Sequence, residues 1–146
     1  MNIKALLIGG LIPTLLLGLG TVLMKLSMRE GSSVPNYLVQ VGATVLAAGL
    51  LATALGDGWV STPKAGMFAV IMGMAWATAI GCMTYAISSL GIPVSVISPL
   101  TNSNAVVAVT GSALLLGEWA NLNGPRVLAG TALIIAGAIV VSSARS

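Results

Sequence analysis

The sequence predicts an all-α membrane protein, a polytopic bundle of five transmembrane helices. The first observation is composition: 57% of the 146 residues are hydrophobic and 6% are charged, whereas a soluble domain averages about 25% charged residues. The second is that the apolar residues form five runs, each close to the roughly 20 residues that a spanning helix needs. The runs lack the two-residue alternation of membrane β-strands, so helices are the class that satisfies the backbone in lipid.

The five predicted segments are joined by short polar connections, and we treat residues 1–146 as a single transmembrane domain. The segments cover residues 5–24, 37–56, 65–90, 93–117 and 127–143. Tyr37, Trp59 and Trp119 stand at segment ends, where interfacial aromatic residues are enriched. Gly73, Ala77 and Gly81 recur four residues apart in the third segment, a spacing that lets membrane helices approach closely.

The sequence lacks the residues that several classes of function require. Cys82 is the only cysteine, histidine is absent, and there are three acidic residues. We therefore expect no internal disulfide, no metal site, no cofactor and no enzymatic acid–base machinery. Six basic residues without a cluster do not provide the basic stripe of a nucleic-acid-binding protein.

The basic residues are balanced across the two faces that five crossings would create. The face of the N-terminus carries Lys4, Lys64 and Arg126, and the opposite face carries Lys25, Arg29 and Arg145. Orientation follows the excess of Lys and Arg in cytoplasmic loops, and here neither face has an excess. Two interpretations stay open: the first helix decides the orientation through Lys25 and Arg29, or the chain inserts in both orientations.

The fourth segment is the most polar of the five and contains the main candidate site. Asn102 and Asn104 lie next to Pro99 and Ser98, and a proline frees a carbonyl one turn before it. A broken helix with freed carbonyls and amide side chains is how membrane carriers often contact a substrate. The alternative is that both asparagines only hold helices together.

Two further groups of candidates lie in other segments. Trp76 and Tyr85 in the third segment are candidates to wall a pocket for an organic or cationic ligand, against the alternative of simple packing. Pro13 in the first segment is predicted as a second helix break, and Thr14 beside it is a weaker substrate-binding candidate.

Two charged residues stand at segment ends and are either gates or structural groups. Glu118 follows the fourth segment, and the structural interpretation pairs it with Asn123 or Arg126. Lys25 follows the first segment and either extends its ammonium to the interface or faces a carboxylate or another anionic substrate.

Residues 84–141 contain an ordered series of motifs. They are Thr84-Tyr85-Ala86, Leu90-Gly91-Ile92-Pro93-Val94-Ser95, Pro99-Leu100-Thr101-Asn102-Ser103-Asn104-Ala105, Leu115-Leu116-Gly117-Glu118-Trp119 and Gly130-Thr131-Ala132-Leu133-Ile134-Ile135-Ala136-Gly137. The series resembles the EamA-like branch of the drug/metabolite transporter superfamily. One departure is Ala105, where that family commonly has proline, so we expect Pro99 to provide the kink instead.

The resemblance implies a short member of that family. Most members resemble two fused five-helix repeats, whereas this chain corresponds to one repeat. It implies a secondary transporter that moves a small polar or amphipathic metabolite by alternating access, as a homodimer in the inner (plasma) membrane. Small multidrug exporters of the same superfamily couple through a glutamate in the first helix, and residues 5–24 contain no acid. The alternatives are a non-transporting membrane subunit and one half of a heteromeric carrier with a paralogous partner.

Overall fold

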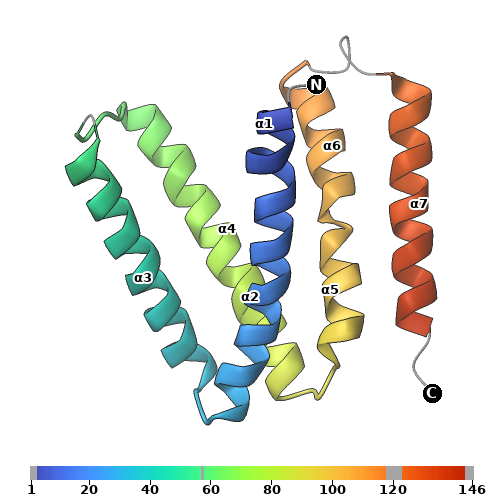
Figure 1. Cartoon of the computed structure of the whole chain (residues 1–146), viewed down its shortest axis with the longest axis horizontal. Coiled ribbons are helices and arrows are strands. Elements are labelled where there is room, and N and C mark those ends of the chain that lie inside the picture. Colours follow the sequence, from blue (N-terminus) through green and yellow to red (C-terminus); the bar gives the residue numbers. More distant parts are fainter. Residues whose placement is uncertain (1–2, 57, 118–122, 144–146) are drawn as a thin grey trace. The chain divides into compact units, whose positions relative to one another are not determined.

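The computed structural model describes residues 3–56, 58–117 and 123–143, and every regular element in these ranges is helical. Figure 1 shows the helices coloured along the sequence. Four of the five predicted segments are helices long and apolar enough to cross a membrane: Ile3–Arg29, Val34–Leu55, Pro63–Ser88 and Gly124–Ser143. The remaining segment, residues 93–117, is also helical but is interrupted. The prediction of an all-α membrane bundle is confirmed.

The helices form two compact units, Met1–Gly91 and Ile92–Ser146. The first unit contains α1 (Ile3–Leu6), η1 (Leu7–Leu11), α2 (Ile12–Arg29), α3 (Val34–Leu55) and α4 (Pro63–Ser88). The second contains α5 (Val94–Asn102), α6 (Asn104–Leu115) and α7 (Gly124–Ser143). The single-domain assignment of the chain stays a prediction.

The core of the first unit lies where α2 packs against the end of α4. Met24 on α2 is 2% exposed, and Thr84 and Ile87 on α4 are fully buried. The Thr84 hydroxyl donates to the carbonyl of Ile80 at 2.7 Å, so its polar group is satisfied within its own helix. The buried Thr84 hydroxyl therefore needs no hydrogen-bond partner from α2.

The α3–α4 contact uses one of the small residues that the four-residue spacing singled out. A Cβ placed on Gly81 would lie 3.4 Å from Cδ1 of Leu38 on α3, which is a close approach of the two helices. Nothing lies within 4 Å of the corresponding position on Gly73. The spacing thus identifies the contact face at one end of α4 and not along its whole length.

Three long helices begin at a polar cap followed by proline. The Ser33 hydroxyl accepts from the Asn36 N–H at 3.4 Å and the Thr62 hydroxyl from the Ala65 N–H at 3.2 Å. The Asn123 side chain accepts from the Arg126 N–H at 3.2 Å. Each bond satisfies an N–H that the first turn leaves without a helical partner, and proline in that turn lacks the donor that would be orphaned.

The second unit is formed by α5, α6 and α7, with α5 packed against α7. Ile97 on α5 and Ala138 on α7 are buried. Figure 1 shows α5 and α6 following one another along a single direction with a break between them. The fourth predicted segment thus consists of two short helices, α5 and α6, rather than one continuous helix.

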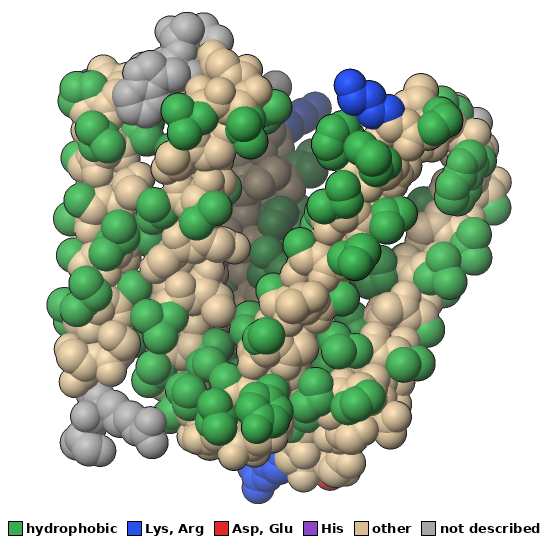
Figure 2. Space-filling model, turned by 180° about the vertical axis from the view of Figure 1, so that it is seen from behind, with side chains coloured by type: hydrophobic (Ala, Val, Ile, Leu, Met, Phe, Trp, Pro, Cys, Tyr) green, Lys and Arg blue, Asp and Glu red, His purple; other side chains and the backbone are tan. Residues whose placement is uncertain are grey.

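Most large apolar side chains on the helices are exposed. Among them are Leu16, Leu50, Val70 and Leu133, one on each of the four long helices. Figure 2 shows the hydrophobic side chains spread along the helices, with basic side chains at helix ends on the face in view. A soluble protein rarely exposes contiguous apolar surface of this extent, so the chain is a multi-pass membrane protein.

Candidate functional site

The interruption between α5 and α6 is centred on Ser103. Its backbone N–H donates to the carbonyl of Leu100 at 3.2 Å, and its own carbonyl accepts from the Val106 N–H at 3.0 Å. Both bonds span three residues instead of the four of an α-helix. The backbone therefore tightens at Ser103, where α5 ends and α6 begins.

Side-chain hydroxyls satisfy carbonyls on the α5 side of the break. The Thr101 hydroxyl lies 3.0 Å from the carbonyl oxygen of Ile97 and 3.1 Å from that of Ser98. The Ser103 hydroxyl donates to the carbonyl of Pro99 at 3.3 Å. Hydroxyl groups that bond the preceding turn in this way compete with the backbone ladder and favour bending.

The break lies one turn later than the proline that was expected to cause it. α5 continues through Pro99 and ends at Asn102. Pro99 has no N–H to offer the Ser95 carbonyl, yet the backbone stays helical at that point and tightens at Ser103. The half-buried Ser98 lies within α5 on the N-terminal side of the break.

Asn102 and Asn104 flank the break, and their side chains are exposed. Within the described residues, no hydrogen bond joins either amide to another group. An amide placed in hydrocarbon without a partner costs several kcal/mol, on the order of 2–7. These two side chains therefore require water, a ligand or another protein surface beside them.

The depth of the break follows from the helix lengths. α5 has nine residues and α6 has twelve, which at 1.5 Å per residue gives about 13 Å and 18 Å. Together they match the hydrocarbon thickness of about 30 Å. The break therefore falls near the middle of the interrupted segment.

The first helix is also irregular around its predicted break. The N–H of Ile12 bonds the carbonyl of Leu7, which closes a π-helical turn at Leu7–Leu11 just before Pro13. The Thr14 hydroxyl donates to the carbonyl of Gly10 at 2.9 Å. Pro13 accounts for this turn, because its ring cannot continue a regular ladder to Gly9.

Trp76 and Tyr85 do not form the shared wall that was predicted for them. Both lie on α4, which is continuous from Pro63 to Ser88. Nine residues correspond to about 13 Å along the axis and about half a turn around it, so the two rings point to opposite sides of α4. Trp76 is 38% exposed and Tyr85 54% exposed, and each remains a separate candidate contact.

Lys25 has a specific partner on another helix. Its ammonium donates to the carbonyl of Ile87 at 3.2 Å. Ile87 is in the last turn of α4, where carbonyls have no helical N–H partner. Lys25 thus caps the end of α4, which supports its structural interpretation. Glu118 lies outside the described residues, and its role as gate or structural group stays a prediction.

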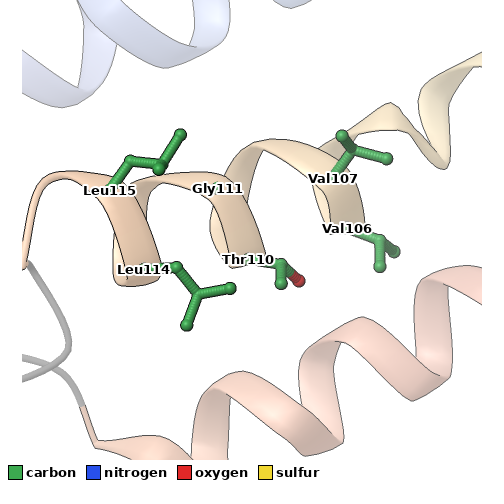
Figure 3. A pocket seen from close by; sticks show the side chains of 6 residues that line it. All are labelled: Val106, Val107, Thr110, Gly111, Leu114 and Leu115. Atoms are coloured by element: carbon green, nitrogen blue, oxygen red, sulfur yellow. The ribbon is translucent and has the colours of Figure 1, made fainter.

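An apolar depression lies along α6, in the half of the interrupted segment that follows the break. It has a volume of about 450 Å³ and is lined by Val106, Val107, Thr110, Gly111, Leu114 and Leu115. Figure 3 shows Val106, Thr110 and Leu114 along one side of α6, with Val107 and Leu115 along another. Residues four apart share a helix face, so the surface beside the break is mostly apolar.

Sequence reasoning missed three features of these sites. Thr101 and Ser103 hold the carbonyls around the break, and their position just after Pro99 was the available signal. Ile87 could not be recognised as the partner of Lys25, because the two residues are 62 positions apart. The apolar face of α6 was visible only as part of an apolar run.

No protein-family model, no curated protein and no solved structure matches the chain.

Proposed function

We propose that the chain is a secondary transporter that moves a small polar or amphipathic metabolite across the membrane by alternating access. The observation that carries the proposal is the break at Ser103, where Asn102 and Asn104 present amides without hydrogen-bond partners among the described residues. Polar groups within a membrane segment are costly and usually functional. Discontinuous helices near the midplane form the substrate sites of many carriers.

The chemistry of the break suits an uncharged or zwitterionic polar ligand. Each asparagine amide offers two donors and one acceptor oxygen, so the pair can bind hydroxyl, amide, amine or carboxylate groups. The apolar face of α6 beside the break can contact the hydrocarbon part of an amphipathic molecule. Binding and release need no cofactor and no chemical step, in keeping with a carrier rather than an enzyme.

The resemblance of residues 84–141 to the EamA-like transporters supports the same proposal from the sequence. Most members of that family resemble two fused five-helix repeats. This chain would provide one such repeat, and a homodimer of inverted copies in the inner (plasma) membrane would provide both. Inverted repeats are the usual basis of alternating access in such carriers.

A non-transporting membrane subunit is the second candidate, because the exposed amides of Asn102 and Asn104 also suit a contact with another membrane protein. Interhelical hydrogen bonds of this kind average about 0.6 kcal/mol. A paralogous partner that completes a heteromeric carrier would use the same surface. Transport by the purified chain alone excludes both alternatives.

The test begins with a thermal-shift screen of purified protein against amino acids, nucleosides, polyamines and organic cations, since a ligand of the native state raises its apparent stability. Uptake of each ligand found is then measured in liposomes. We expect Asn102→Leu to abolish uptake while the far-ultraviolet circular dichroism and elution volume stay unchanged. Thr44→Val is the matched control, a polar-to-apolar change at an exposed position of α3 that lines neither the break nor the α6 depression, and should retain uptake. Full activity of Asn102→Leu would place the substrate site elsewhere.

The inverted dimer makes a prediction about topology. With three basic residues assigned to each face, one or two added charges should set the orientation. Two lysines added after Ser146 should hold the C-terminus inside, and two added after Asn2 should hold the N-terminus inside. Each variant alone should transport poorly, and co-expression should restore transport. A C-terminal reporter found on one side only in the unmodified protein would exclude the inverted homodimer.

A further inference from the structure

A second polar feature lies in the first unit, at the ends of α2 and α4. An open depression of about 340 Å³ is lined by Lys25, Met28 and Arg29 from α2 and by Ser88 from α4. Two of its four lining side chains are cationic, and one carries a hydroxyl. The volume is sufficient for a phosphate group and part of a lipid headgroup.

Lys25 is held in place in this depression, and neither cation has a carboxylate partner among the described residues. The Lys25 ammonium is fixed by its bond to the Ile87 carbonyl and keeps two further N–H donors. Arg29 follows one turn later on the same face of α2. In the described ranges no carboxylate forms an ion pair with either side chain, although Glu30 is the next residue along the chain.

Capping alone does not require this arrangement. The C-terminal ends of α2 and α4 carry partial negative charge, and Lys25 already satisfies a carbonyl there. Arg29 donates no side-chain hydrogen bond within the described residues, and the Ser88 hydroxyl contacts only that of Ser89, at 3.4 Å. A second cation and a weakly bonded hydroxyl around an open volume are the groups that an oxyanion needs.

The depth of the depression matches the phosphate level of a membrane. The span Ile3–Arg29 has 27 residues and Pro63–Ser88 has 26, so each is about 40 Å long at 1.5 Å per residue. This exceeds the hydrocarbon thickness of about 30 Å by about 10 Å. When that excess is shared between the two ends, Arg29 and Ser88 lie about 5 Å outside the hydrocarbon.

We propose that Lys25, Arg29 and Ser88 form a binding site for a phosphate group, and that its occupant is the headgroup of an anionic phospholipid. Basic pockets between membrane helices bind such headgroups. The bound phosphate would join α2 to the end of α4 by accepting from both helices. The site lies in the first unit and does not rest on the transport proposal.

The test uses the purified full chain in dodecyl maltoside. Apparent Tm and lipid adducts in native mass spectra are measured with phosphatidylglycerol, with phosphatidylcholine, and with inorganic phosphate without added lipid. The variants are Arg29→Gln, which leaves the Lys25–Ile87 bond intact, and Lys25→Arg, which keeps both the charge and a donor. Lys64→Gln is the matched control, because it removes an exposed cation at the opposite end of α4.

We expect phosphatidylglycerol to raise Tm and to give more adducts than phosphatidylcholine. Arg29→Gln should weaken this binding about tenfold, the effect of losing one charge-assisted hydrogen bond, while Lys25→Arg and Lys64→Gln keep it. A shift that depends on Arg29 with inorganic phosphate, and not with phosphatidylglycerol, would identify a soluble anion as the occupant and overturn the lipid assignment. Equal binding of the two lipids, or equal losses in Arg29→Gln and Lys64→Gln, would overturn the site.

Discussion

The bond between Lys25 and the carbonyl of Ile87 allows a quantitative prediction for Lys25→Met. Methionine keeps the apolar stem that packs along α2 but removes the donor. Leaving a buried acceptor unpaired costs about 1–3 kcal/mol. Ile87 is fully buried, whereas the bond itself is only partly buried, so water can reach the vacated position. We therefore expect a loss near the lower limit, about 1 kcal/mol.

The assay is thermal unfolding in detergent, followed by tryptophan fluorescence. For a chain of this size about 1 kcal/mol corresponds to a decrease in Tm of about 4 °C. Arg29→Met is the matched control, since it removes a cation of similar length one turn away that caps no carbonyl in the described residues. Lys25→Arg should restore most of the loss. Equal Tm values for Lys25→Met and Arg29→Met would refute the capping role. A transport defect without a stability defect would instead support a gate.

Two further predictions rest on the helix bounds and contacts, and a third on the sequence alone. Topology reporters fused at Arg29 and Lys64 should report opposite sides of the membrane, and a common side would show that α3 does not cross. Gly81→Leu should destabilise the protein by about 1–3 kcal/mol, because the larger side chain overpacks the α3–α4 contact. Gly73→Leu is the control and should not destabilise the protein, because the space around Gly73 is open. Equal Tm values for the two variants would contradict the α3–α4 contact at Gly81. Glu118→Gln should lower stability or dimer yield more than it alters the pH dependence of transport, and loss of that pH dependence would assign a proton site.

The fold could be predicted because apolar run length is a direct consequence of membrane thickness. The bounds were less accurate, for physical reasons that can be identified. The first run was closed at Lys25, but the helix continues to Arg29, because a lysine at a helix end can place its charge outside the hydrocarbon. The second and third helices start before their apolar runs, at the caps Ser33 and Thr62.

Residue types in the sequence indicated where the helix would be irregular but not the geometry of that irregularity. The polar character of the fourth segment singled out Asn102 and Asn104, which flank the break, and their role in binding stays a prediction. The proline was expected to cause the break, yet Pro99 lies inside α5 and the break occurs at Ser103. The position of such a break depends on which hydroxyl groups reach which carbonyls, and composition does not specify this. The partner of Lys25 is set by the α2–α4 packing, which no local pattern encodes.

The depth of the break bears on how two copies would assemble. When two copies are related by an axis that lies in the membrane midplane, a given residue has the same depth in both copies only if it lies at the midplane. α5 and α6 place the break about 13 Å from one end of a passage of about 31 Å, within about 3 Å of the middle. An inverted copy would therefore present its own Asn102 and Asn104 at nearly the same depth, where the four amides could line one polar chamber. In a parallel pair, the breaks of the two copies would lie at equal depth wherever the break occurred in the segment. A central break is therefore required by the inverted pair and not by the parallel pair. If the balance of basic residues lets the chain insert in both orientations, the central break would give the two orientations a common site.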